Sequence, residues 1–274
     1  MTGFDPAAPR LKPRLAQGPA VGAVWCTLGA PVMVEVACRF APDLIVIDMQ
    51  HGLFDRPGLE VAVGLSTVPV AVRTRDDHPA SIGEALDAGA EGVIVPLIES
   101  AEAAAAVASS CRYPPDGHRS GGGVRPLADM AAHAAHANAG VVAGVMIETE
   151  RGVEAASEIA ASGVDLVFIG TGDLALSLSV APGSPDHEAA CETVRTAAQD
   201  AGIPCGIFAM DAGSAAARAA AGYHLSVAAI DLDILAHGIK HSVETFRAAP
   251  LPAPKVKSRA RRRTRTSVRR KSGS

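Results

Sequence analysis

Aromatic residues are scarce in this chain of 274 residues: only 3% are Phe, Trp or Tyr, and there is one Trp. Apolar residues make up 48% and are mostly Ala and Val, so small and branched side chains have to fill the core. Such a composition is typical of helices packed closely on a sheet. The five cysteines show no paired spacing, which excludes a disulfide framework and a zinc cluster and predicts reduced thiols.

Long hydrophobic runs are also missing. No uninterrupted apolar segment reaches the roughly 18 residues that a membrane helix needs. The first residues, MTGFDPAAPRLKPRL, lack the apolar stretch of a secretory signal. The sequence therefore predicts a cytoplasmic protein that does not enter a membrane.

Acidic residues are absent from one part of the chain. Residues 251–274 carry ten Lys or Arg and no acid. Residues 1–250 therefore contain the other 15 of the 25 basic residues and all 29 acidic ones, which gives this body a net charge of −14. So acidic a body argues against nucleic acid as a partner, except through the basic tail. The tail has almost nothing to bury, and we predict that it is disordered.

Short β-branched runs alternate with Ala-rich stretches along the rest of the chain, as in βα units around a parallel sheet. We predict eight strands, at 21–25, 44–49, 70–74, 92–96, 143–148, 165–170, 205–210 and 225–231. A doubly wound sheet fits that count too, but no GxGxxG turn follows the first strand. We therefore predict an α/β fold, a single-domain (β/α)8 TIM barrel over 21–250, between an N-terminal extension (1–20) and the tail (251–274).

Helical spacing and terminal glycines predict the helices between these strands. They are expected at 79–88, 101–109, 152–161, 187–201, 212–221 and 233–248. The connection 111–139 contains several Pro and Gly residues and is predicted to be a loop, of a length that is usually functional.

Polar residues at the carboxyl ends of barrel strands are the expected catalytic groups. Glu148 and Asp173 follow adjacent strands at matching depth, so two carboxylates should meet over the barrel mouth. A divalent cation would remove their repulsion, and oxygen ligands with open positions suit Mg²⁺ or Mn²⁺. The alternative is that each carboxylate only caps the helix that follows it.

Further candidate groups lie at the ends of three predicted strands. His51 is a candidate base whose imidazole Asp48 could hold; the alternative is a surface histidine beside an acid. Arg73 ends an apolar strand, so it either binds a substrate carboxylate or enolate oxygen, or pairs with Glu99 or another carboxylate. The turn Gly170-Thr171-Gly172-Asp173 could bind an anion through its N–H groups, although such turns begin many helices.

The chain resembles the HpcH/HpaI aldolase and citrate lyase family, nearer to its branch of 2-keto-3-deoxy sugar acid and hydroxy-ketoacid aldolases. The resemblance runs from about Val21 to Ile239. Its motifs are DLIVIDMQHG (43–52), VR (72–73), HPASIGEALDAGAEGVIVP (78–96), RYPPDGHR (112–119), VMIET (145–149) and FIGTGDLALSL (168–178).

The resemblance implies a homohexameric class II aldolase that cleaves a 4-hydroxy-2-oxo acid to pyruvate and an aldehyde through a metal-stabilised enolate. Glu148 and Asp173 would hold the cation, Mg²⁺ or Mn²⁺, with Co²⁺ or Zn²⁺ as alternatives. Arg73 would steady the enolate oxygen, and His51, oriented by Asp48, would act as base. Trp25 would lie beside the pyruvate methyl; without the resemblance it would simply be a core residue.

Four departures from the family pattern leave the aldehyde and the donor open: Met49-Gln50, Met146, Thr171-Gly172 and Ser120. None removes a proposed ligand or base. Two rival functions are kept. One is a lyase for malyl-CoA or citramalyl-CoA at the same site, which the acidic body disfavours. The other is a non-catalytic barrel that its basic tail tethers to nucleic acid or another anionic surface.

Overall fold

The computed structural model describes residues 10–248, and its eight parallel strands close into a barrel in chain order, β1 to β8. The predicted (β/α)8 barrel is confirmed, and the doubly wound sheet is excluded. The strands are β1 (Val21–Cys26), β2 (Leu44–Asp48), β3 (Val70–Arg73), β4 (Gly92–Val95), β5 (Val142–Ile147), β6 (Leu166–Ile169), β7 (Cys205–Ile207) and β8 (Leu225–Ile230).

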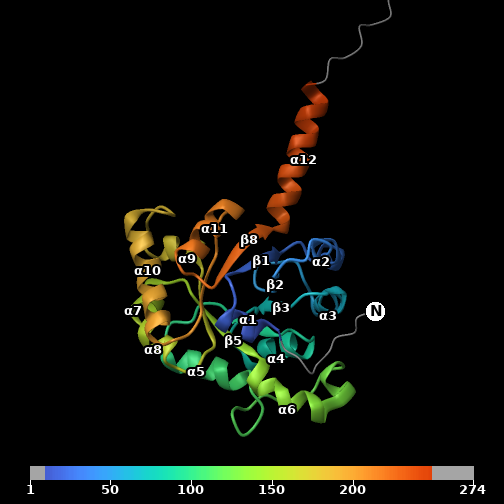
Figure 1. Ribbon diagram of the computed structural model, residues 1–274, viewed down its shortest axis with the longest axis vertical. Coiled ribbons are helices and arrows are strands. Elements are labelled where there is room, and N and C mark those ends of the chain that lie inside the picture. The colour runs from blue at the N-terminus through green and yellow to red at the C-terminus, as the bar shows by residue number, and fades with distance from the viewer. Residues whose placement is uncertain (1–9, 249–274) are drawn as a thin grey trace, which may run out of the picture. The chain divides into compact units, whose positions relative to one another are not determined.

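Helices surround the strands on the outside of the barrel (Figure 1). In chain order, the helices of residues 10–248 are α1 (Leu11–Gln17), α2 (Pro31–Cys38), α3 (Arg56–Leu65), α4 (Pro79–Asp87), α5 (Ala101–Ser110), the 3-10 helix η1 (Pro126–Asp129), α6 (Met130–Gly140), α7 (Glu150–Glu154), α8 (Ala156–Ala160), α9 (Thr171–Ser177), α10 (Pro185–Asp200), α11 (Ala212–Ala220) and α12 (Asp231–Ala248).

Two helical predictions were wrong in detail. The helix expected at 152–161 is two short helices, α7 and α8, which break at Ala155. The expected loop 111–139 is irregular only until η1, and α6 occupies its last third. The side chain of Asp129 caps α6 by accepting from the N–H of Ala132 at 3.0 Å, a start signal that the Pro and Gly residues upstream concealed.

Alternate residues along the strands build two apolar layers, because successive side chains point to opposite faces of a strand. One layer packs between strands and helices and includes Ile45, Ile47 and Val72. The other fills the barrel interior, where Trp25 and Phe168 are among the largest buried side chains. Aromatic residues are few, yet these two lie together here, with ring centroids 5.8 Å apart.

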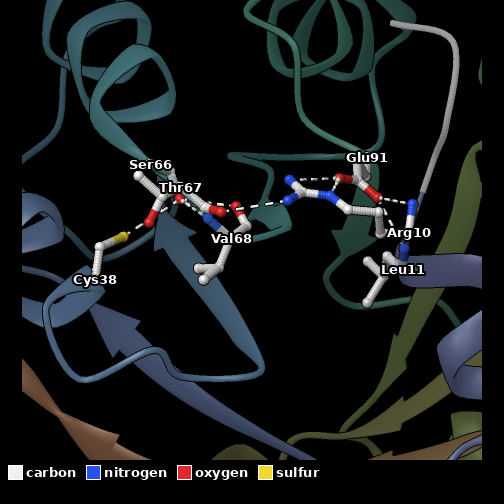
Figure 2. Close-up of polar contacts among 7 residues, drawn as sticks. All are labelled: Arg10, Leu11, Cys38, Ser66, Thr67, Val68 and Glu91. Atoms are coloured by element: carbon white, nitrogen blue, oxygen red, sulfur yellow. Dashed lines mark hydrogen bonds and ion pairs between the residues drawn. The ribbon is translucent and has the colours of Figure 1, made fainter. Parts of the chain in front are cut away.

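Helix α1 closes the amino-terminal end of the barrel, although the sequence predicted only an extension there. Leu11 and Leu15 are 1% and 3% exposed and belong to the interior apolar cluster. Glu91, just before β4, accepts from the main-chain N–H groups of Arg10 and Leu11 at 2.6 and 2.8 Å (Figure 2). The Arg10 guanidinium also donates to Glu91 and to the carbonyl of Thr67. These bonds fix the helix at the end of the barrel opposite the catalytic face.

The chain divides into two compact units, 1–236 and 237–274, and the barrel lies in the first. Helix α12 begins in the first unit, and its residues from His237 onward belong to the second. The predicted disorder of 251–274 lies outside the described residues. Among residues 10–248, no helix is both long and apolar enough to cross a bilayer.

Candidate active site

The inward-facing series of residues turns polar where the strands end. Asp48 continues the series of Leu44 and Val46 on β2, and it pairs in register with Arg73 of β3. Glu148 follows β5 and continues the series of Met146. The strand alternation therefore places three charged side chains over the carboxyl end of the barrel interior, the catalytic face of this fold.

Asp48 and Arg73 form a buried two-pronged ion pair. Arg73 Nε donates to Asp48 Oδ1 at 2.9 Å and Nη2 donates to Oδ2 at 2.5 Å, and the two residues are 9% and 1% exposed. Burial opposes ionisation of Asp48, but the hydrogen bonds and charge of Arg73 outweigh it, helped by the His51 N–H and the Trp25 indole. Together they hold the pKa of Asp48 below its usual value. Arg73 therefore pairs with a neighbouring carboxylate, and that carboxylate is Asp48, not Glu99.

Trp25 lies within the barrel interior. It is 1% exposed, its indole Nε1 donates to Asp48 Oδ2 at 3.4 Å, and the Arg73 guanidinium stacks over its ring at 5.2 Å. Phe208 meets the ring edge to face at 5.3 Å. These contacts are those of a core residue that supports the Asp48–Arg73 ion pair. Contact of Trp25 with a substrate stays a prediction.

His51 is held by its main chain. Asp48 Oδ1 accepts from the N–H groups of Gln50 and His51, at 3.0 and 3.2 Å. The predicted bond between Asp48 and the imidazole is therefore wrong for this structure, because Arg73 and these amides occupy the carboxylate. The His51 side chain is exposed, and among the described residues its ring has no hydrogen bond or ion pair. It is free to meet a substrate at the mouth of the barrel.

Glu148 is a buried carboxylate that resists ionisation. It is 1% exposed, and its Oε1 accepts from the N–H of Leu97 at 2.9 Å. Burial and, to a smaller extent, the nearby Asp173 carboxyl raise the pKa of Glu148 to about 7. The Leu97 bond and the charge of Arg73 act in the opposite direction but do not outweigh them. Leu97 has φ of +58°, which is rare for a branched residue, so backbone strain accompanies this contact. No sequence pattern had singled out Leu97.

Asp173 lies in the first turn of α9, and its carboxyl group contributes to the raised pKa of Glu148. The helix begins at Gly170, which has no side chain to cap it, and Asp173 is three residues further on. Asp173 is therefore not the N-cap residue, the structural alternative considered for it. Asp173 thus influences the Glu148 carboxyl, and binding of one cation by the two groups stays a prediction.

The chemistry of this donor pair fits a divalent cation. Two carboxylates at close range repel one another when both are ionised, and a cation between them would remove that cost. Residues 10–248 contain no cluster of three or more His, Cys, Asp or Glu side chains that could hold a metal. A cation at Glu148 and Asp173 would thus keep several positions for water or substrate, as Mg²⁺ commonly does.

A buried histidine anchors the turn 170–173. His187 is 2% exposed; its Nε2 donates to the carbonyl of Thr171 at 2.9 Å, and its Nδ1 accepts from Gly183 N–H at 3.2 Å. The Thr171 hydroxyl donates to the carbonyl of Phe208 at 3.0 Å. His187 therefore has a structural role, and its bond to Thr171 places it next to this turn.

Gly170 leaves no room for a side chain. A Cβ there would lie 2.4 Å from Glu148 Oε2 and 3.0 Å from Met146 Sδ. We expect Gly170→Ala to displace the Glu148 carboxylate and to lower the free energy of unfolding by about 1–3 kcal/mol, as overpacking does. Urea titration measures this. Gly172→Ala is the matched control in the same turn, because its Cβ would meet nothing within 4 Å; equal stability of the two variants would contradict the prediction.

A cavity of about 490 Å³ lies elsewhere, between α4 and the loop 118–122. Asp87, His118 and Arg119 are among its lining residues, and Arg119 donates to Asp87 at 3.1 Å. The lining residues of this cavity include none of the predicted site residues.

The chain matches a known protein family over most of its length. A model of the HpcH/HpaI aldolase/citrate lyase family matches residues 22–238, nearly the whole barrel. This chain belongs to the HpcH/HpaI family. A hydroxypyruvate/pyruvate aldolase of Rhizorhabdus wittichii is 37% identical over 234 residues, 82% of this chain and 93% of the relative. A 5-keto-4-deoxy-D-glucarate aldolase of Salmonella gallinarum is 34% identical over 196 residues, 68% of this chain and 76% of the relative.

A solved structure extends the likeness to the fold. An HpcH/HpaI family protein of Burkholderia cenocepacia has a TM-score of 0.82 at 32% identity, and the match covers 88% of this chain and 100% of that one. The resemblance predicted from the motifs is confirmed. The protein is a carbon–carbon lyase, an aldolase of the HpcH/HpaI family.

Proposed function

We propose that this HpcH/HpaI aldolase is a divalent-metal-dependent class II enzyme that cleaves or forms the C3–C4 bond of a 4-hydroxy-2-oxo acid. The products of cleavage are pyruvate and an aldehyde. The observation that carries the proposal is the buried Glu148, with its pKa raised to about 7, beside Asp173 at the carboxyl end of the barrel. Relatives named hydroxypyruvate/pyruvate aldolase and 4-hydroxy-2-oxovalerate aldolase support the choice of substrate class.

Glu148 and Asp173 would hold the cation, Mg²⁺ or Mn²⁺, through carboxylate oxygens. When bound, the cation supplies Lewis acidity that favours negative charge on the 2-oxo oxygen of the substrate. The N–H groups of the turn 170–173, at the start of α9, favour an anionic group such as the substrate carboxylate. The site therefore fits an anionic 2-oxo acid.

Arg73 is prepared to receive an oxygen that becomes negative. Asp48 engages its Nε and Nη2, and Nη1 has no hydrogen-bond acceptor among the described residues. The pair fixes the plane of the guanidinium, so Nη1 can donate to the enolate oxygen without a prior rearrangement. Asp48 is thus a positioning residue for Arg73, besides holding the main chain of His51.

His51 takes the proton from the C4 hydroxyl in the cleavage direction. As that O–H bond breaks, its electrons form the C=O of the aldehyde, and the C3–C4 bond breaks. The electron pair of that bond forms the C2–C3 double bond of the pyruvate enolate, whose oxygen Arg73 faces. A proton then adds to C3 and completes pyruvate.

We expect His51→Ala to lower kcat by about 10²–10⁴-fold, the usual contribution of one positioned base. Mn²⁺ affinity, measured by calorimetry, should stay unchanged, because His51 is not a proposed ligand. His136→Ala on α6 is the control for loss of an exposed histidine. Wild-type kcat in the His51 variant would remove His51 from the reaction.

The substrate class is tested by pyruvate release from a panel of 4-hydroxy-2-oxo acids that differ in their aldehyde portion. Malyl-CoA and citramalyl-CoA belong in the same panel, since turnover of these alone would favour the rival lyase. We expect release from at least one 4-hydroxy-2-oxo acid and none from the thioesters.

The role of the basic tail can be tested separately. We expect removal of residues 251–274 to leave pyruvate release unchanged, because the proposed site lies entirely in the barrel. Loss of activity on removal would contradict this assignment, and loss of binding to DNA or RNA alone would identify the tail as a tether. The homohexamer and the cytoplasmic location stay predictions from the family resemblance and the unpaired cysteines.

A further inference from the structure

Asp231 is a buried carboxylate for which the proposed reaction has no role. It directly follows β8, is 3% exposed, and has no ion pair among the described residues. Its Oδ1 accepts from the N–H and hydroxyl of Thr27, both at 2.9 Å, and from Leu232 N–H at 2.8 Å. Its Oδ2 accepts from Leu28 N–H at 3.1 Å. Four donors compensate the buried charge and fix the segment after β1 to the end of β8.

The segment that Asp231 holds touches the loop that carries His51. The Thr27 carbonyl accepts from Leu53 N–H at 2.8 Å. Gly29, with φ of +66°, lies so close to this loop that a Cβ would come within 2.5 Å of the Leu53 carbonyl oxygen. Leu53 is only two residues beyond His51, so the position of the β1 segment sets the position of the far end of this loop.

The near end of the same loop is fixed by Asp48, through the N–H groups of Gln50 and His51. Gly52 packs against the start of the loop, where a Cβ would lie 2.1 Å from the Asp48 carbonyl oxygen. The loop is thus anchored at two points. One anchor is the Asp48–Arg73 pair, and the other leads through Thr27 to Asp231.

Main-chain anchors matter here because the His51 ring has no hydrogen bond or ion pair among the described residues. The place of the imidazole is therefore set by the backbone that carries it. A shift of about 1 Å in a reacting group can cost on the order of 10²-fold in rate.

We propose that Asp231 is a positioning residue for His51, acting through Thr27, Leu28 and Leu53. The proposal rests on the proposed function, in which His51 is the base. Asp231 itself touches neither substrate nor metal ligands. The alternative is that Asp231 only begins α12 through its bond to Leu232.

The test compares Asp231→Ala with Asp231→Asn in the full-length protein loaded with Mn²⁺. Alanine removes all four bonds, whereas an asparagine oxygen in the place of Oδ1 keeps three of them and loses only the bond from Leu28. We expect kcat to fall by about 10–100-fold in the alanine variant and by less than about tenfold in the asparagine variant. KM should change by no more than about twofold.

The matched control is Asp165→Ala. Asp165 precedes β6 at the opposite end of the barrel and accepts from Ala143 N–H at 2.9 Å and from Arg112 at 3.1 Å. Its loss should lower the melting temperature without changing kcat. If Asp231→Asn and Asp231→Ala both fold and both have the kcat of the wild type, the proposal is overturned.

Two further readouts separate this proposal from the proposed function. In a double-mutant cycle, Asp231→Ala should slow the His51→Ala enzyme by less than about twofold, because the group it positions is gone; additive losses would overturn the proposal. Amide hydrogen exchange of residues 50–54 should be faster in Asp231→Ala and unchanged in Asp165→Ala. Exchange needs no substrate, so an inactive wild type would refute the proposed function while unchanged exchange would refute the role of Asp231.

Discussion

Replacing Glu148 by Gln is expected to abolish pyruvate formation and, in metal-free protein at pH 8, to raise the free energy of unfolding. Activity is lost because a neutral amide cannot, with Asp173, balance a divalent cation. Stability rises because burial and the neighbouring Asp173 raise the pKa of Glu148 from 4.5 to about 7. The folded state then keeps a proton that the unfolded chain releases, so wild-type stability falls as the pH rises from about 4.5 to 7. The gain from Gln should be on the order of 1–3 kcal/mol.

Urea unfolding in EDTA at pH 5 and pH 8 measures this gain, which should be small at pH 5 and larger at pH 8. Glu158→Gln, at an exposed site on α8, is the control for removing one negative charge. A Glu148→Gln variant that still forms pyruvate on addition of Mn²⁺ would contradict the proposed ligand. A variant less stable than wild type at pH 8 would contradict the account of Glu148 as a destabilising buried charge.

The second large effect is expected on stability from Asp48→Asn. The substitution leaves Arg73 buried and uncompensated, and breaking one side of a buried pair costs about 3–5 kcal/mol. Arg73 would also lose one of the two bonds that orient it, because the amide of Asn has only one acceptor oxygen, so kcat should fall as well. For comparison, Glu35→Gln removes an exposed ion pair with Arg39, worth about 0–1 kcal/mol.

The pH dependence gives this prediction a second check. Because the pKa of Asp48 is lowered in the folded state, its stabilisation is present above the unfolded value of 3.8 and is lost as the pH falls through the folded value. The difference in unfolding free energy between wild type and Asp48→Asn should thus stay constant from pH 5 to 8 and shrink below pH 4. A difference under about 1 kcal/mol at pH 7 would mean that the pair does not carry this stabilisation.

The strands and their polar ends were predictable because both follow from local pattern. Eight β-branched runs predicted eight strands, and each observed strand lies within a predicted range or extends beyond it by one residue. Glu148 and Asp173 follow adjacent strands, and adjacent parallel strands bring their carboxyl ends together. The prediction that the two carboxyl groups meet therefore required only the strand order.

Contacts that depend on register and on loop path were not predictable. Asp48 lies next to both His51 in sequence and Arg73 in space, and only the β2–β3 register decides that its carboxylate binds Arg73. Asp231 is the last residue of the predicted strand 225–231, but its partners Thr27 and Leu28 are more than 200 residues away in the chain. Helix α1 escaped prediction because its seven residues are too few to form a stable helix alone, and burial of Leu11 and Leu15 in the barrel stabilises it.

The central claim, that Glu148 and Asp173 share a cation which also binds a 2-oxo acid, is tested most directly by crystals grown with Mn²⁺ and pyruvate. An anomalous difference map should show one peak, about 2.0–2.6 Å from a carboxylate oxygen of each residue, with the oxygens of pyruvate completing its coordination. A map with no peak between these two carboxyl groups, while pyruvate or Mn²⁺ is bound elsewhere, would contradict it.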